Sequence, residues 1–285
     1  MIPASFEYFS PRSLREAVDL LSSHVEDVKI LAGGQSLVPL MKLRLAKPGY
    51  IVDLSRIREL NYIREEGDRI AIGSLTTHAE IEESELLKRR CPLLPQTAAT
   101  IGDVQVRNQG TIGGSLAHAD PAGDMPAAIL ALGAEMKAIG PSGERSIKAE
   151  DFFIGLLTSA LEPNEILTEV RVPVLEKTKT AYLKAAQKAS GFAVVGIAVC
   201  LRLDQGRTCG DIAIGVTGVA DRPYRAEDVE KILRGKKLEE KLIEEAANKV
   251  VKGQDVIEDI NGSKDYRSHL ATVYAARAIR TALEA

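Results

Sequence analysis

Two pairs of adjacent glycines, set in similar surroundings, constrain this chain most. Gly33 and Gly34 follow an apolar lead-in, as do Gly113 and Gly114, and small polar residues come next in both places before apolar residues resume. Glycine adopts positive φ easily and lets another backbone approach closely, so successive N–H groups can converge on a phosphate. Two such loops could hold a pyrophosphate from two sides, which makes a dinucleotide the implied ligand.

The usual nucleotide-binding motifs do not occur in this sequence. A Rossmann site would show G-x-G-x-x-G after a strand, and a P-loop would show G-x-x-x-x-G-K-[ST]; neither string is present. A glycine pair taken alone is more often a plain tight turn than a ligand site. The similarity of the two pairs, together with the residues after the second pair, shifts the balance toward a site.

Residues 104–124 are the strongest candidate for that site. Gly, Thr, Ser, Asp and Asn dominate this stretch, which ends in two aspartates, Asp120 and Asp124. A carboxylate facing a phosphate would repel it, so ribose hydroxyls are the natural partners of these carboxylates. The structural alternative is nearly as good for each residue: Asp120 caps a turn before Pro121, and Asp124 caps a helix over residues 125–132.

No metal site and no catalytic side chain are predicted. His118 with Asp120 and Asp124 is not a distinctive zinc pattern. The three cysteines contain no C-x-x-C pair and are too few for a four-cysteine cluster. His118 alone lies in the glycine-rich region, and the other histidines are predicted to be surface or packing residues: His24, His78 and His269.

Residue patterns before position 175 predict alternating strands and helices. Ser10 and Pro11 predict the cap and first turn of a helix with an apolar stripe over residues 14–21. A strand, a helix and a strand then form a βαβ-like unit, and Thr77 with Glu80 has the capping-box pattern. The predicted strands are 28–31 and 50–54, a hairpin over 62–72 and a strand over 166–174; the further helices lie within 36–46 and 93–101.

The last third of the chain predicts strands followed by helices. Residues 175–180 form a polar connection where a domain boundary can fall. Because the strands come before the helices, the pattern favours an α+β unit. The predicted strands are 180–184, 192–203 and 210–219, and the predicted helices are 226–233, 238–251 and 264–283.

Length and charge narrow the class of protein. A chain of 285 residues is long enough for two domains. Its formal net charge of −3 gives no electrostatic reason to expect nucleic acid or an anionic membrane as partner. The longest apolar runs fall well short of the ~20 residues of a membrane helix, and residues 1–5 lack a basic segment followed by an apolar one. We therefore expect a cytoplasmic protein with no membrane span.

The glycine pairs and the aspartates together resemble the FAD loops of molybdenum hydroxylase flavoprotein subunits. These are the medium subunits of complexes of the carbon monoxide dehydrogenase, xanthine dehydrogenase and aldehyde oxidoreductase type. The stretches that carry the resemblance are residues 32–36, 111–115 and 119–124. Residues 182–184, 191–203 and 265–267 are similar to the family's C-terminal domain, so the resemblance runs along the whole chain.

The resemblance implies an α+β fold with two domains. Residues 1–175 would form an FAD-binding domain of the vanillyl-alcohol oxidase (PCMH) type, with subdomains at about 1–55 and 56–175. Residues 176–285 would form a smaller C-terminal domain of the carbon monoxide dehydrogenase flavoprotein type, with strands followed by helices.

The resemblance also implies which residues bind FAD. The first glycine loop, residues 31–37, and the second glycine loop, residues 110–115, would hold the pyrophosphate and the ribityl chain. Asp124 would lie near the adenosine ribose and Lys184 near the flavin ring, whereas Ile101 and Leu167 could equally be core residues. The expected cofactor-binding residues are Leu31, Ala32, Gly33, Gly34, Gln35, Ser36, Leu37, Ile101, Gly110, Thr111, Gly113, Gly114, Ser115, Asp120, Asp124, Leu167 and Lys184.

The implied activity is that of an oxidoreductase subunit with FAD as its only cofactor. Electrons would leave the substrate at a molybdenum cofactor in a large subunit and pass through 2Fe–2S clusters in a small subunit to FAD in this chain. NAD, a quinone or oxygen would then accept them, in a complex of three different chains doubled into a heterohexamer. The alternatives are a stand-alone flavin-dependent reductase of the same superfamily, a nucleotide-binding module without redox activity, and a scaffold whose glycine pairs are only turns.

Overall fold

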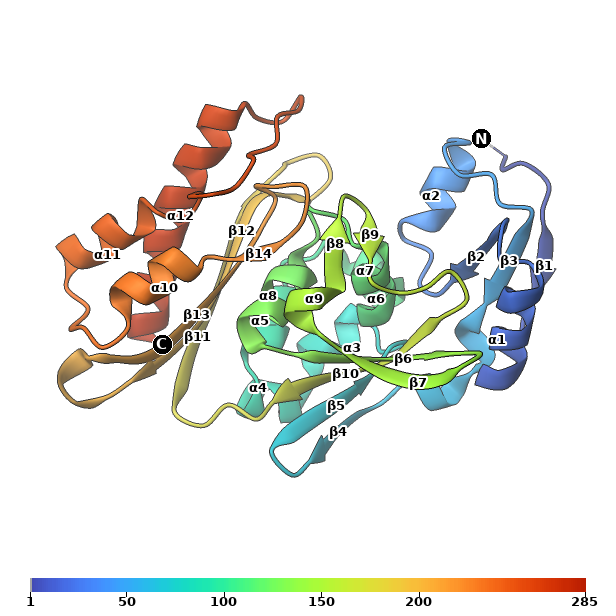
Figure 1. Cartoon of the computed structure of the whole chain (residues 1–285), viewed down its shortest axis with the longest axis horizontal. Helices are drawn as coiled ribbons and strands as arrows, with labels where there is room; N and C mark the ends of the chain where they lie inside the picture. The colour runs from blue at the N-terminus through green and yellow to red at the C-terminus, as the bar shows by residue number, and fades with distance from the viewer. Residues whose placement is uncertain (1) are drawn as a thin grey trace.

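The computed structural model describes residues 2–285 and arranges them in three blocks in chain order. Figure 1 shows an N-terminal block at one end, a central block and a C-terminal block at the other end. Each block has its own sheet and its own cluster of buried apolar side chains. No helix within residues 2–285 combines the length and the apolar character needed to cross a membrane.

The N-terminal block is a three-stranded parallel sheet in the order β1-β3-β2. Strands β2 and β3 pair directly and in parallel, and helix α2 connects them in the sequence, which confirms the predicted βαβ unit. The elements of this block are β1 (Glu7–Phe9), α1 (Leu14–Ser23), β2 (Val28–Leu31), α2 (Leu37–Lys42), β3 (Tyr50–Asp53), η1 (Leu54–Arg56) and η2 (Arg58–Leu60).

The boundaries of both helices in this block differ from the prediction. Ser13 caps α1, because its backbone is extended and its hydroxyl accepts from the Glu16 amide, so the predicted cap at Ser10 is wrong. Helix α2 ends at Lys42, and Arg44 then adopts a left-handed φ of 59°, which stops the helix before residue 46.

The central block is built on a five-stranded sheet in the order β4-β5-β10-β6-β7, antiparallel throughout. The predicted hairpin is confirmed as β4 and β5, and the Thr77–Glu80 capping box is present at the start of α3. Its strands are β4 (Ile63–Glu66), β5 (Arg69–Gly73), β6 (Glu135–Gly140), β7 (Gly143–Lys148) and β10 (Ile166–Pro173), with a separate hairpin of β8 (Phe153–Gly155) and β9 (Thr158–Ser159). Its helices are α3 (His78–Glu83), α4 (Glu85–Arg90), α5 (Leu93–Ala98), α6 (Val104–Gln109), α7 (Ile112–His118), α8 (Asp124–Leu132) and α9 (Ala149–Phe152).

The C-terminal block has the predicted order of strands followed by helices. Its antiparallel sheet has the order β11-β12-β13-β14. The elements are β11 (Thr178–Ala186), β12 (Ala193–Leu203), η3 (Gln205–Arg207), β13 (Cys209–Thr217), β14 (Tyr224–Arg225), α10 (Glu227–Leu233), α11 (Glu240–Ala247) and α12 (Lys264–Glu284).

Strand β12 is apolar on both faces because both faces are covered. Ile197 and Val199 pack with the side chains of α10, α11 and α12, whereas Ala198 and Cys200 pack in the cluster that contains α8. Side chains alternate between the two faces of a strand, so a continuous apolar run is typical of a strand buried on both sides. Helix α8 therefore lies against the sheet of the C-terminal block although it belongs to the central block.

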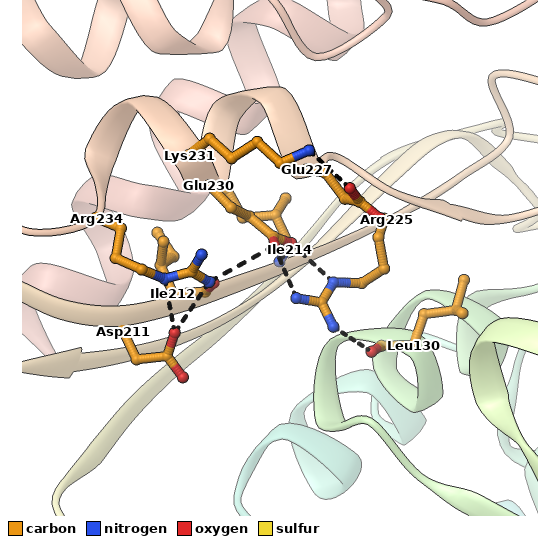
Figure 2. A network of polar contacts seen from close by, with 9 residues as sticks. All are labelled: Leu130, Asp211, Ile212, Ile214, Arg225, Glu227, Glu230, Lys231 and Arg234. Carbon is orange, nitrogen blue, oxygen red and sulfur yellow. Dashed lines mark hydrogen bonds and ion pairs between the residues drawn. The ribbon is translucent and has the colours of Figure 1, made fainter.

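A close backbone contact and a hydrogen bond from Arg225 fix α8 on that sheet. A Cβ added at Gly215 of β13 would lie 1.9 Å from the carbonyl oxygen of Ala127, so only glycine permits this approach. At the other end of α8, the Arg225 guanidinium donates to the Leu130 carbonyl oxygen at 3.3 Å (Figure 2). The same guanidinium makes a two-pronged ion pair with the buried carboxylate of Glu230, at 2.7 and 2.8 Å.

Replacing Gly215 by alanine is expected to destabilise the protein. The added methyl group must displace α8 from β13, and overpacking of this kind typically costs about 1–3 kcal/mol. Urea unfolding of Gly215→Ala should show a lower midpoint than the parent chain. Gly155→Ala is the matched control, because a Cβ there meets no atom within 4 Å and its φ is not positive. Equal midpoints for the two variants would contradict the packing argument.

Candidate functional site

A cleft of about 960 Å³ brings together segments from all three blocks. The first glycine loop lines it from the N-terminal block, and the second glycine loop lines it from the central block. Ser190, Gly191 and Phe192, from the connection between β11 and β12, reach it from the C-terminal block. This volume lies within the range of about 300–1,000 Å³ typical of ligand sites.

The structure brings nearly all the sequence-predicted site residues to this cleft. Leu31 and Lys184 are the exceptions among them: neither lines the cleft. Ile101 and Leu167 line it and also pack against the core of the central block, which confirms the core alternative and leaves their contact with the cofactor a prediction. The predicted residues that line the cleft are Ala32, Gly33, Gly34, Gln35, Ser36, Leu37, Ile101, Gly110, Thr111, Gly113, Gly114, Ser115, Asp120, Asp124 and Leu167.

The first glycine loop carries unused backbone donors. Within the described chain, the N–H groups of residues 33–37 donate to no protein acceptor. Gly34 has a positive φ of 69°, which turns the chain between β2 and α2. Consecutive free N–H groups in such a turn form a concave site for an anion. The loop can therefore bind a phosphate through its main chain.

The second glycine loop uses its amides internally. Gly113 donates its N–H to the Ser74 carbonyl oxygen at 2.9 Å, and Gly114 donates to the Thr111 hydroxyl at 3.1 Å. Both glycines lie in the first turn of α7 and have no positive φ. A Cβ on Gly113 would lie 2.5 Å from the Ser74 Cβ, so close packing requires this glycine. The main-chain N–H groups of Gly113 and Gly114 are therefore already paired, unlike those of the first glycine loop.

Gly33 is where the two glycine loops touch. A Cβ at this position would lie 2.1 Å from the Gln109 carbonyl oxygen and 2.7 Å from the Gly110 Cα. Any other residue at position 33 would have to push the second loop away. The narrowness of the cleft at this point thus depends on one missing side chain.

Asp124 is buried and already hydrogen-bonded. It is the first residue of α8, after the N-cap Gly123, and its side chain makes no cap to the helix. Its carboxylate accepts from the Tyr182 hydroxyl at 2.5 Å and from the Lys184 ammonium at 2.9 Å. Burial raises the pKa of Asp124, and the positive charge of Lys184 opposes that rise. The predicted helix cap at Asp124 is wrong, because the side chain turns toward β11.

All three hydrogens of the Lys184 ammonium group have acceptors within the protein. Besides Asp124, its ammonium donates to the Thr100 carbonyl oxygen at 2.6 Å and to the Gly191 carbonyl oxygen at 2.7 Å. In the described structure these donations hold Lys184 and Asp124 against each other. The expected placement of Asp124 near the adenosine ribose and of Lys184 near the flavin ring stays a prediction.

Asp120 lines the cleft but also stabilises a turn. Its Oδ1 accepts from the Ala122 N–H at 2.8 Å, which is the structural role proposed as the alternative. Its other oxygen lies 4.0 Å from the His118 Nε2, and His118 lines the cleft as well.

Ser74 and His78 are two of the cleft residues that sequence reasoning did not assign to the site. Both line the cleft, with only 3% of Ser74 and 4% of His78 exposed. The Ser74 hydroxyl and the His78 Nδ1 have no hydrogen-bond partner among residues 2–285. Burial, and secondarily the charge of Arg107, lowers the pKa of His78 to about 4, so its ring is neutral at pH 7. The capping box placed His78 at a helix start, but nothing in the sequence shows that it reaches Gly110.

Fold and site together define a cofactor-binding protein of the FAD-binding class. The chain belongs to the flavoprotein family of the molybdopterin dehydrogenases. Residues 4–175 match the family described as "FAD binding domain in molybdopterin dehydrogenase", and residues 180–282 match the "CO dehydrogenase flavoprotein C-terminal domain". The predicted family, the α+β fold and FAD as cofactor are confirmed, and the chain is of the oxidoreductase-subunit type.

Relatives match this chain from end to end. The glyceraldehyde dehydrogenase medium chain of Sulfolobus acidocaldarius is 40% identical, over 98% of this chain and 99% of its own length. The carbon monoxide dehydrogenase medium chain of Hydrogenophaga pseudoflava is 41% identical, over 99% of this chain and 98% of its own length. A solved structure of carbon monoxide dehydrogenase from Hydrogenophaga pseudoflava superposes with a TM-score of 0.97, 41% identity and coverage of 100% and 99%. The solved structure of quinoline 2-oxidoreductase from Pseudomonas putida superposes with a TM-score of 0.94 at 33% identity, covering 100% of this chain and 99% of its own.

His78 is expected to make stability depend on pH between about 6.5 and 4. The folded chain keeps this imidazole neutral down to about pH 4, whereas the unfolded chain protonates it near 6.5. The unfolded state therefore binds more protons in this window, and the free energy of unfolding falls as the pH falls, by about 3 kcal/mol in total. Urea unfolding at pH 7, 5.5 and 4 should show a smaller fall for His78→Asn. Above pH 7 the two proteins should run parallel; a constant difference down to pH 4 would refute the assignment.

Proposed function

We propose that this chain is the electron-transferring medium subunit of a molybdenum-containing hydroxylase or dehydrogenase complex. In this proposal, electrons come from 2Fe–2S clusters of a small subunit, which receives them from a molybdenum cofactor in a large subunit, and leave through FAD to NAD, a quinone or oxygen. Two relatives that match over nearly their whole length are medium chains, and one solved relative is a carbon monoxide dehydrogenase that lacks the Mo-pyranopterin moiety of its molybdenum cofactor. The observation that carries the proposal is the run of unused amides at residues 33–37 in a cleft of dinucleotide size.

The residues of the cleft fit FAD on the evidence of their own geometry. The free amides of the first glycine loop suit a pyrophosphate, because main-chain N–H groups bind anions without a charged side chain. The contact at Gly33 leaves a narrow passage between the two loops. On the opposite wall, buried polar atoms of Ser74 and His78 have no protein partner among residues 2–285. A ligand with an anionic centre and polar flanks would satisfy these groups.

We propose the following roles for the residues of this chain. The first glycine loop binds the pyrophosphate of FAD. Gly110, Thr111 and Ser115 of the second loop contact the ribityl chain of FAD beside it. Ile101 and Leu167 supply apolar wall. Asp124, Tyr182 and Lys184 form one buried group that holds Gly191 at the edge of the cleft. Bound FAD supplies the redox chemistry, and the protein orients it and shields it from water.

The same proposal covers domain limits and location. We propose that residues 1–175 act as the FAD-binding unit, with subdomains at about 1–55 and 56–175, and that residues 176–285 complete the cleft from the other side. The family matches at 4–175 and 180–282 support this division. We expect the complex to work in the cytoplasm.

Widening the contact at Gly33 should cost cofactor. Gly33→Ala places a methyl group against the Gln109 carbonyl, so the loops must separate and the FAD content per chain, measured by visible absorbance, should fall at least about tenfold. Gly155→Ala should keep full FAD content. Circular dichroism and the thermal midpoint would show whether Gly33→Ala is folded. A folded variant with full FAD content would refute the proposed pyrophosphate site.

Gentle purification of the native protein tests the assembly. We expect a yellow complex in which this chain co-purifies with a larger and a smaller chain, and in which elemental analysis finds molybdenum and iron. A lone yellow chain that oxidises or reduces a soluble substrate would instead support the stand-alone reductase. A colourless preparation that cannot be reconstituted with FAD would rule out both.

A further inference from the structure

Two buried polar atoms of residues that line the cleft have no hydrogen-bond partner among the described residues. The Ser74 hydroxyl and the His78 Nδ1 are both inaccessible to water and lack a hydrogen-bond partner among the described residues. Ser74 directly follows β5, His78 is the first residue of α3, and both residues line the cleft; residues 74–78 are called the β5–α3 segment. Buried polar atoms are nearly always paired in folded proteins, so two orphans on the same wall require an explanation.

This segment lies directly behind the second glycine loop. The Ser74 carbonyl accepts from the Gly113 N–H at 2.9 Å, and the His78 N–H donates to the Gly110 carbonyl at 2.9 Å. A Cβ on Gly110 would lie 3.0 Å from the His78 Cδ2, so the imidazole packs on that glycine. Gly110 in turn approaches Gly33 of the first loop. Ser74 and His78 therefore contact the loop that borders the proposed pyrophosphate site, and both line the same cleft.

The second wall must contact a ligand through side chains. The amides of Gly113 and Gly114 are committed within the protein. A serine hydroxyl both donates and accepts, and a neutral imidazole has one donor and one acceptor nitrogen. His78 is neutral at pH 7 because of its burial. Such groups suit uncharged hydroxyls, whereas a phosphate would be better served by cations or by the free amides on the other wall.

We propose that Ser74 Oγ and His78 Nδ1 bind the sugar hydroxyls next to the pyrophosphate of the bound dinucleotide, after a small side-chain rotation that ligand binding induces. This inference rests on the proposed FAD site and assigns a different part of the ligand to each wall of the cleft. The first loop binds the anion through its backbone, and the β5–α3 segment binds the polyol through side chains. FAD offers hydroxyls of this kind on its ribityl chain and on its ribose.

Titration with FAD and with ADP tests the inference. The full chain, with any subunits that co-purify, is stripped of cofactor and titrated by flavin fluorescence for FAD and by calorimetry for both ligands. Ser74→Ala and His78→Leu should each raise the Kd for FAD by roughly 5- to 10-fold, as expected for the loss of one hydrogen bond. If the affinity for ADP falls as well, the contact is to the ribose; if only FAD is affected, the contact is to the ribityl chain.

Matched variants separate this role from a merely structural one. His78→Asn keeps a polar atom near the position of Nδ1 and should bind FAD within about twofold of the parent. Ser10→Ala removes an equally buried hydroxyl that does not line the cleft and should leave the Kd unchanged. Folded Ser74→Ala and His78→Leu proteins with the parental Kd for FAD would overturn the inference while leaving the proposed function intact. A parent protein that binds no FAD would overturn the proposed function and the inference together.

Discussion

The cleft depends on the contact between two backbones that are far apart in the sequence. Gly33 and Gly110 meet without an intervening side chain, and this contact joins the N-terminal block to the central block at the mouth of the first glycine loop. Because residue 33 has no Cβ, the second glycine loop can approach the first glycine loop closely. The amides of the first glycine loop remain free of protein acceptors. Anion binding through the main chain and close approach of the opposite wall thus require the same residue.

The C-terminal block is coupled to this cleft through α8. The helix is buried between the central core and the sheet of β11 to β14, and its two ends are bound from the C-terminal side by Lys184 and Arg225. Lys184 also fixes the backbone of Gly191, which lines the cleft. A buried carboxylate is costly unless it is paired, so Asp124 ties the position of α8 to the presence of Tyr182 and Lys184. Through Lys184, the C-terminal block therefore positions Gly191 in the lining of the cleft.

The sequence predicted local features well where local physical chemistry decides them. The capping box at Thr77, the hairpin turn at Gly67-Asp68 and the strand-before-helix order after residue 175 are all present. The cap of α1 was placed three residues too early, because Ser10 and Ser13 are both good caps and only the folded backbone selects between them. The helix cap expected at Asp124 is wrong for a different reason: the 2.9 Å contact of Asp124 with Lys184 joins positions 124 and 184 across two blocks.

By itself, the sequence determined the family, the α+β class and the two glycine loops that line the cleft, because two glycine pairs and the aspartates that follow are local patterns with a specific chemistry. Only the tertiary structure decided which amides stay free, which carboxylate is already paired and which buried polar atoms have no partner among the described residues. Hydrogen bonds from Gly113 to Ser74 and from Lys184 to Asp124 join residues distant in the chain. Whether a polar group is available for binding depends on such partners, and no local pattern specifies them.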